Sequence, residues 1–245
     1  FFTWRDVKVK YKHTFIGAAW AIFQPFITMI IFTVFFGHFA KLPSDGIPYP
    51  IFVYTGLLFW TLFSTGLTQS SNSFVDNEKI VTKIYFPRII LPISSILTNI
   101  IDFFVAFVIL IGMMFYYQFT PSIVGIILFP ILILLTIFST LGIGLLFASL
   151  NVKYRDVRFI LPFFIQLLLF VTPVIYPVSI VGANYRWILG LNPMSGVIDA
   201  ARAGILGTRE IDWILLGFSA GMMVIYCFIG FFYFKKVERY FADVI

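Results

Sequence analysis

The chain has five long stretches without Asp, Glu, Lys or Arg. Each stretch exceeds the roughly 20 residues that a helix needs to cross about 30 Å of hydrocarbon. Because a backbone in hydrocarbon must satisfy its own hydrogen bonds, we expect these stretches to form membrane-spanning helices. They lie between Lys12 and Lys41, Asp45 and Asp76, Asp102 and Lys153, Arg158 and Arg186, and Trp213 and Phe234.

Turn-forming and charged residues divide these stretches into six predicted spans. The expected fold class is therefore an all-α integral membrane protein with a single transmembrane domain over residues 1–245. Glycine pairs at 142/144 and 217/221 are expected to allow close contact between spans. The predicted spans are 18–39, 51–73, 90–116, 122–149, 158–177 and 212–234, of which the first five occupy 18–177.

Composition and charge also favour a membrane location. Hydrophobic residues make up 60% of the chain and charged residues 11%, against about 25% charged in a typical soluble domain. For a soluble protein, a net charge of +6 would suggest binding to nucleic acid. Here, thirteen of the 17 Lys and Arg residues lie in segments on the same side of the membrane as the N-terminus. The positive-inside rule then places both termini in the cytoplasm, and we expect no nucleic-acid partner.

The first segment, 1–16, is not a span. Trp4, Val7, Tyr11 and Phe15 fall on one helical stripe with basic residues beside it. This pattern predicts an amphipathic helix that lies at the membrane interface. Its role stays open between membrane anchoring alone and an added contact with a partner protein.

Two internal loops, 74–89 and 150–158, combine charged residues with apolar residues at helical spacing. We predict a short cytoplasmic helix in each loop, and a cytoplasmic tail at 235–245. Loops between spans are usually solvent-exposed turns without a further role. Compact charged helices with apolar positions indicate docking surfaces instead.

The segment 178–211 is apolar in part, but charged residues interrupt it before any stretch becomes long enough to span a bilayer. Apolar segments of such length are more often re-entrant or interfacial. We predict two short helices that dip into the outer leaflet and are separated near Asn192 and Pro193.

Sequence motifs for catalysis or cofactor binding are not found. The G-x-x-x-x-G-K-[ST] motif that cradles ATP does not occur. His13 and His38 lie at opposite ends of the first predicted span, and Cys227 is the single cysteine, so we expect neither a metal site nor a disulfide. Serine and threonine residues lack an obvious neighbouring base, so a nucleophilic site is unsupported.

Asp102 is the charged residue that lies well inside a predicted span. An ionised carboxylate there costs on the order of 3 kcal/mol, so it should be neutral, paired or directed toward the bundle interior. Two roles stay open. Asp102 either lines a pore or proton path, or it fixes helix packing through hydrogen bonds near Asn99 or Gln166.

Aromatic residues make up 20% of the chain, more than the belts at the membrane interface require. Aromatic rings suit a passage for sugars, because sugar rings have apolar faces and hydroxylated rims. The alternative is that these rings pack against lipid and neighbouring helices. The candidates for lining a channel are Phe35, Tyr54, Phe59, Trp60, Asp102, Phe170 and Tyr176.

Several motifs in combination resemble a known transporter family. They cover essentially the whole chain and are similar to ABC-2 type transporter permeases, most of all to the subfamily that exports polysaccharides such as O-antigen or teichoic acid. The matching motifs are residues 4–20 with Gln24-Pro25, residues 77–88 with Leu91-Pro92, residues 151–157, and residues 191–194 with Arg202 and Gly207.

The resemblance implies a homodimer that works with two copies of an ABC ATPase subunit. That partner would bind ATP and Mg²⁺, and this chain would need no cofactor of its own. The interface helix and the two internal coupling helices would dock on the ATPase, and 178–211 would form an external gate. The implied docking residues are Asp76, Glu78, Lys79, Lys83, Tyr85, Tyr154, Arg155 and Asp156, and the implied gate residues are Asn192, Pro193 and Arg202.

The implied cargo is a polysaccharide attached to undecaprenyl diphosphate, which crosses the bacterial inner membrane through a channel in the dimer. Since cations suit phosphate groups, the candidates for the diphosphate entrance are Arg5, Lys8, Lys12 and Arg88. Two alternatives stay open. One is an ABC-2 exporter of teichoic acid, capsule, lipid or drug, and the other is a membrane-embedded transferase that acts on lipid-linked sugar.

Overall fold

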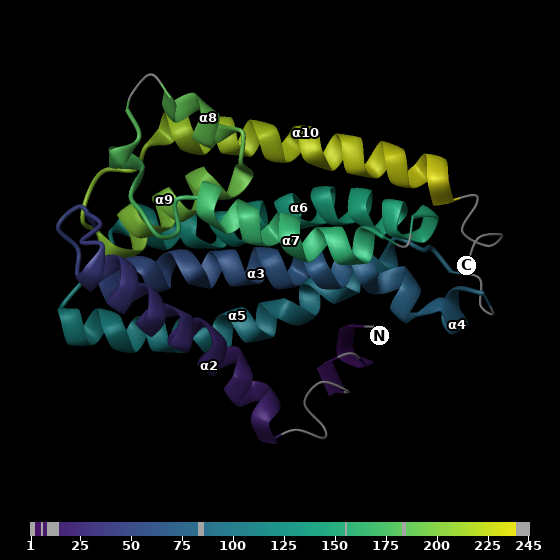
Figure 1. Cartoon of the computed structure of the whole chain (residues 1–245), viewed down its shortest axis with the longest axis horizontal. Coiled ribbons are helices and arrows are strands. Elements are labelled where there is room, and N and C mark those ends of the chain that lie inside the picture. Colours follow the sequence, from purple (N-terminus) through teal and green to yellow (C-terminus); the bar gives the residue numbers. More distant parts are fainter. Residues whose placement is uncertain are drawn as a thin grey trace.

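The computed structural model describes residues 3–5, 7–8, 15–82, 86–154, 156–182 and 185–238. Across these ranges the chain forms helices and loops and contains no strand. The long helices run side by side in one elongated bundle (Figure 1). We name its two ends after the helices found there: the α4 end, at the right of Figure 1, and the α9 end, at the left.

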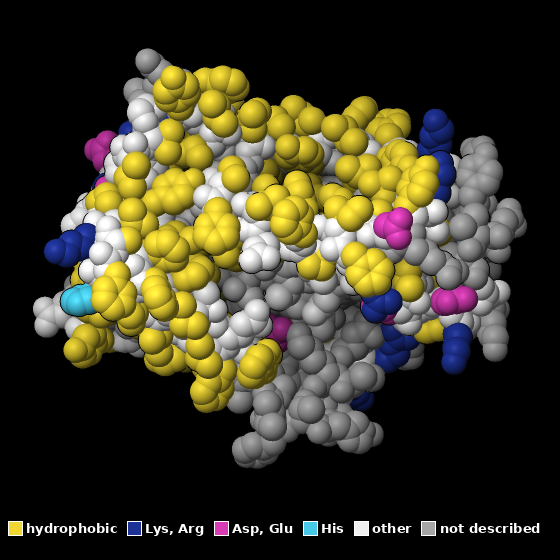
Figure 2. Space-filling model, viewed as in Figure 1, with side chains coloured by type: hydrophobic (Ala, Val, Ile, Leu, Met, Phe, Trp, Pro, Cys, Tyr) yellow, Lys and Arg dark blue, Asp and Glu magenta, His cyan; other side chains and the backbone are white. Residues whose placement is uncertain are grey.

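Among the described residues, five helices are long and apolar enough to cross a membrane. In the first, α2 (Phe15–Phe32) continues into a π-helix, η1 (Thr33–Phe39), and the candidate span covers Trp20–Phe39. On the face that Figure 2 shows, apolar side chains cover the middle of the molecule and most charged ones lie toward its ends. The chain is therefore a multi-pass membrane protein. The other four helices are α3 (Tyr49–Asp76), α5 (Ile90–Tyr117), α6 (Ile123–Lys153) and α10 (Trp213–Val237).

The predicted span at 158–177 is shorter as a helix than the sequence pattern suggests. The helix found there, α7 (Val157–Val171), has 15 residues, about 22 Å at 1.5 Å per residue. It ends because Thr172 precedes Pro173 and adopts an extended conformation with ψ 138°, as expected for a residue before proline. A sixth span is therefore not confirmed, and the chain instead turns toward α9.

Helix α3 forms the centre of the bundle. In the most apolar 18-residue stretch of α3, 78% of the residues are buried, whereas the corresponding share in the first span is 11%. Helices α2, α5, α6 and α9 all pack on it. Phe59 of α3 contacts Phe103 of α5 and Phe129 of α6, with ring centres 5.3 and 6.4 Å apart. Aromatic packing of this kind holds α3, α5 and α6 together.

Glycines set the contact between α6 and α10. A Cβ atom placed on Gly230 would lie 2.0 Å from the carbonyl oxygen of Gly142, so the two backbones touch directly. Gly144 likewise packs against α3, as predicted for this pair. The other predicted pair is different: a Cβ atom on Gly217 or Gly221 meets no described atom within 4 Å, so these two glycines face outward from α10.

The two internal loops are not alike. In the first, α4 (Glu78–Val81) follows α3 after Asn77. In the second, α6 continues to Lys153, Tyr154 becomes extended (φ −129°, ψ 103°), and α7 begins at Val157. Among the described residues of 150–158, only the end of α6 and the start of α7 are helical, so the separate helix predicted there is not found among them.

The segment 178–211 contains a short 3-10 helix, η2 (Val178–Ile180), and two α-helices, α8 (Arg186–Gly190) and α9 (Pro193–Leu206). The two α-helices lie where two short helices were predicted. Every residue of α9 is buried, and α9 packs on α3, α6, α8 and α10. Of the predicted interface helix, residues 3–5 and 7–8 are helical. Residues 15 and 16 belong to α2. The remaining residues of that predicted helix, and residues 239–245 of the tail, lie outside the described residues.

Candidate gate and translocation surface

Arg202 lies buried at the centre of the α9 end, with an exposed fraction of 1%. Its guanidinium donates hydrogen bonds to the backbone carbonyls of Phe52 (3.0 Å), Pro173 (2.6 Å) and Val174 (2.6 Å). It also lies 3.6 Å from the centre of the Phe52 ring, a cation–π contact. One side chain therefore ties α9 to α3 and to the turn that follows α7.

Gly56 makes room for this guanidinium. A Cβ atom at position 56 would lie 2.6 Å from Nη2 of Arg202, closer than such atoms approach. Alanine would be the better helix former at this position. The contact between α3 and α9 therefore depends on a glycine as well as on an arginine.

Asn192 and Pro193 begin helix α9. Oδ1 of Asn192 accepts a hydrogen bond from the backbone N–H of Met194 (3.0 Å), which caps the helix. Pro193 occupies the first turn, where its missing N–H leaves no hydrogen bond unmade. Nδ2 of Asn192 donates to Oγ1 of Thr172 (2.7 Å), so the start of α9 is joined to the end of α7.

The other end of α9 is held by an ion pair and a glycine. The guanidinium of Arg209 donates to the carboxylate of Asp199, which is 1% exposed. Burial raises the pKa of Asp199, while the positive charges of Arg209 and Arg202 lower it. Gly207 ends the helix with φ 64°, and a Cβ atom there would lie 2.4 Å from the carbonyl oxygen of Thr120. The end of α9 therefore rests against the α5–α6 turn.

Two further hydrogen bonds hold the turn after α7 against the start of α3. The Tyr49 hydroxyl donates to the carbonyl of Ile175 (2.8 Å), and the Ser179 hydroxyl donates to the carboxylate of Asp45. Together with the Arg202 contacts, they form one connected network at the α9 end. The predicted gate residues therefore lie in a single packed unit.

A pocket of about 210 Å³, with several polar side chains in a largely apolar wall, lies between α2, α3 and α5. Asp102 lines it together with Asn99, whose Nδ2 donates to Oε1 of Gln69 (2.8 Å). Of the two residues expected near Asp102 if it fixes helix packing, Asn99 lines the same pocket. Gln166, the other, lies on an exposed face of α7. Gln24 also lines the pocket, and like Gln69 it had no predicted role. Within the described ranges, no group of three His, Cys, Asp or Glu side chains is arranged to hold a metal ion.

Three of the predicted channel residues lie inside the core of the chain. Tyr54 and Phe59 have exposed fractions of 0%, and Trp60 has 5%. Because a residue that lines a passage needs free surface, we leave these three out of the proposed lining. Phe35 on η1 and Phe170 on α7 are 59% and 53% exposed. Tyr176 is partly buried, and its hydroxyl donates to a backbone carbonyl of α7 (2.7 Å).

The described docking residues lie at the α4 end and are exposed. These residues are Asp76, Glu78, Lys79, Tyr154 and Asp156. Lys83, Tyr85 and Arg155 lie outside the described residues, as does the entrance candidate Lys12.

Two of the predicted entrance residues make hydrogen bonds within the chain. Arg5 donates to Oδ1 of Asn77 (3.1 Å), which joins the N-terminal segment to the start of α4. Arg88 donates to the backbone carbonyl of Glu238. Both residues therefore tie segments together at the α4 end, while Lys8 is exposed.

Residues 1–206 match the ABC-2 type transporter family. The chain is 27% identical over 242 residues to the O-antigen export system permease protein RfbA of Klebsiella pneumoniae, covering 98% of this chain and 92% of that protein. It is 29% identical over 202 residues to the protein of the same name from Myxococcus xanthus, covering 81% and 76%. It is 22% identical over 243 residues to the polysialic acid transport protein KpsM of Escherichia coli, covering 96% and 91%. Because the family match spans most of the chain and agrees with its membrane-spanning helices, the protein belongs to the ABC-2 type transporter family.

Proposed function

We propose that this chain is the permease subunit of an ATP-driven exporter of bacterial cell-surface polysaccharide of the O-antigen type. The observation that carries the proposal is the match to RfbA of K. pneumoniae, which covers 98% of this chain. The excess of basic residues on one side of the spans supports an inner-membrane location with both termini in the cytoplasm.

The proposed passage forms between two copies of the chain, which would pair through α2 and α7. Both helices present exposed apolar and aromatic side chains, among them Phe35 at the end of the first span and Phe170 on α7. Such rings suit the apolar faces of sugars. The polar side chains in the pocket beside α2, Asp102 among them, would offer hydrogen bonds to hydroxyl groups.

The proposed cargo is linked to undecaprenyl diphosphate and enters from the α4 end. Basic residues there suit a diphosphate, because ammonium and guanidinium groups form charge-assisted hydrogen bonds with phosphate. Among the described residues, Lys8 has the most exposed position of the entrance candidates. Arg5 and Arg88 would act mainly by holding the N-terminal segment and the end of α10 in place.

ATP and Mg²⁺ would be bound by a separate ATPase subunit, present in two copies. The exposed charges of α4 and Asp156, with the exposed ring of Tyr154, form the surface on which it would dock. Asn77 joins this surface to α3 and also accepts a hydrogen bond from Arg5. The N-terminal segment and α4 would thus present one common docking surface.

Export can be tested in cells that lack their own O-antigen permease and carry this chain with its ATPase subunit. We expect polymer at the cell surface when both subunits are present and polymer retained inside when either is missing. Surface polymer is measured with an antibody against the glycan. Export by this chain without an ATPase would contradict the proposal, as would sugar transfer by the purified chain alone.

The docking surface can be tested by exchanging two charges on α4. The double variant Glu78→Lys, Lys79→Glu keeps the net charge but reverses the local pattern. We expect the yield of ATPase that co-purifies with the chain to fall about tenfold, the effect of losing about 1.4 kcal/mol of binding free energy. Glu210→Lys, an exposed change at the α9 end, is the control and should leave the yield unchanged. A double variant that assembles and exports normally would refute the docking role.

A capsule polymer is the second candidate cargo, because KpsM, named as a polysialic acid transport protein, aligns with 96% of this chain. The two candidates separate when the same cells are given either an O-antigen or a polysialic acid pathway. Export of polysialic acid alone would favour the second candidate. Teichoic acid, lipid and drug substrates can be offered in the same way.

A further inference from the structure

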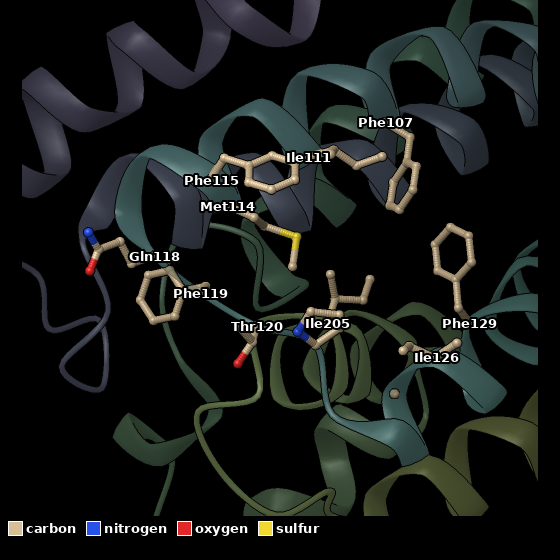
Figure 3. Close-up of a pocket in the computed structure, with 12 residues that line it drawn as sticks. Phe107, Ile111, Met114, Phe115, Gln118, Phe119, Thr120, Ile126, Phe129 and Ile205 are labelled. Atoms are coloured by element: carbon tan, nitrogen blue, oxygen red, sulfur yellow. The ribbon is translucent and has the colours of Figure 1, made fainter.

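A large apolar cavity opens on the side of the bundle near the α9 end. Its volume is about 630 Å³, and it lies between the end of α5 and the start of α6 (Figure 3). Ile205 of α9 forms part of its wall. The residues that define its shape are Phe107, Ile111, Met114, Phe115, Ile126 and Phe129.

The lining fits hydrocarbon and little else. Apolar side chains surround the cavity, while the polar side chains Gln118 and Thr120 lie at the turn that joins α5 to α6. None of the described residues that line the cavity is charged, so a free anion or cation would find no counter-ion among them. A sugar would find too few partners for its hydroxyl groups, and leaving them unpaired is costly.

The cavity is open toward the membrane. Phe115, Ile126 and Ile111 are 81%, 59% and 38% exposed, and they belong to two helices that are apolar enough to span a bilayer. Their outward faces therefore lie against lipid. Because an apolar cavity does not hold water, the molecules available to fill this one are the hydrocarbon chains of the bilayer.

The order of polar and apolar groups along the cavity matches a phospholipid. Gln118 and Thr120 lie at the end of the helices, where headgroups lie, and the carbon lining extends from there toward the bilayer centre. A headgroup can accept and donate hydrogen bonds at the turn while the acyl chain follows the groove. This arrangement favours a lipid that enters from the leaflet at the α9 end.

The cavity also touches the buried helix of the candidate gate. The backbone N–H of Ser122 donates to the carbonyl of Gly204 (3.0 Å), and a Cβ atom on Gly125 would lie 2.0 Å from the same oxygen. Ile205, the next residue of α9, contributes to the wall. A molecule in the cavity therefore contacts both the α5–α6 hairpin and α9.

We propose that one acyl chain of a bilayer phospholipid occupies the cavity formed by Phe107, Met114, Phe129 and Ile205 and holds the α5–α6 hairpin against α9. Without such a chain, the lining would lose its packing partners on one side. The bound lipid is then a structural component of the α9 end, and it exchanges more slowly than the lipids that surround the other helices.

The test uses the full chain in nanodiscs of phosphatidylethanolamine and phosphatidylglycerol. A trace of phosphatidylethanolamine carries a diazirine on its acyl chain, and mass spectrometry locates the label after illumination. We expect labelling to be concentrated on residues 107–129. In Ile126→Trp, labelling there should fall about tenfold, because the indole excludes about two methylenes of the chain.

Ile127→Trp is the matched control. Ile127 follows Ile126 on α6 and is also exposed, at 65%, but it does not line the cavity. Its replacement should leave the labelling unchanged. Ile111→Trp places an indole on the opposite wall of the same cavity. This second variant should also lower the labelling.

Three results would overturn the proposal. The first is labelling spread evenly over all outward helix faces, which would show ordinary surrounding lipid. The second is equal labelling in Ile126→Trp, Ile111→Trp and Ile127→Trp. The third is protection of residues 107–129 from the phospholipid probe, either by a second copy of the chain or by an added prenyl diphosphate. None of these results depends on polysaccharide export.

Discussion

Replacing Arg202 by methionine is expected to lower the free energy of unfolding by roughly 3–5 kcal/mol. The change removes three hydrogen bonds and leaves the carbonyls of Pro173 and Val174 without this buried donor. It also removes the cation–π contact with Phe52. We expect surface export to be lost as well, because α9 is no longer tied to α3. Denaturant titration of the purified chain measures the stability, and surface polymer measures export.

Arg202→Lys and Arg186→Met bracket this effect. A lysine ammonium cannot serve three carbonyls in the fork that a guanidinium provides, so Arg202→Lys should be intermediate. Arg186 forms an exposed pair with Asp212 at 3.7 Å, and its loss should cost no more than about 1 kcal/mol. Wild-type stability in Arg202→Met would show that the three hydrogen bonds contribute nothing net.

Gly230→Ala is expected to destabilise the contact between α6 and α10 by roughly 1–3 kcal/mol, the usual cost of overpacking. The added methyl group would meet the carbonyl oxygen of Gly142, which belongs to backbone and cannot rotate away. The two helices must therefore separate along their length. The thermal unfolding midpoint of the purified chain in detergent measures the effect, and Gly142→Ala should behave in the same way.

Gly221→Ala is the control for this prediction. It lies on the same helix, but its added methyl group meets no described atom. Since alanine is the better helix former, this variant should be as stable as the parent or slightly more so. Equal destabilisation by Gly221→Ala and Gly230→Ala would show that the effect arises within α10 and not from its contact with α6.

The membrane-spanning helices follow from the sequence because their signal is local. A stretch without charges is visible in any window of about 20 residues, and hydrocarbon leaves the backbone few alternatives to a helix. The end of α7 has no such signal in hydropathy. Residues 172–177 are apolar like the helix before them, so hydropathy predicts a longer span, whereas Pro173 ends the helix through backbone sterics.

The candidate site depends on contacts between distant parts of the chain, which a single sequence does not reveal. Arg202 was identified through a family resemblance, but its partners Phe52 and Val174 come from other segments. The same limit applies to Tyr54 and Phe59. Their aromatic character suggested a channel, yet only the packing of α5 and α6 around α3 shows them to be buried. Gln69 carried a usable signal, an amide within an uncharged span.

Because α3 is unbroken, it connects the two ends of the bundle rigidly. Its 28 residues extend about 42 Å without a break, from Asp76, next to the exposed charges of α4, to Tyr49 and Phe52, beside Arg202. A helix that is packed on nearly every side resists bending, so tilting one end of α3 displaces its other end sideways. A partner that tilts α3 through α4 would therefore move the carbonyl of Phe52 relative to Arg202. This coupling needs only the rigid motion of one helix, without a series of small side-chain shifts.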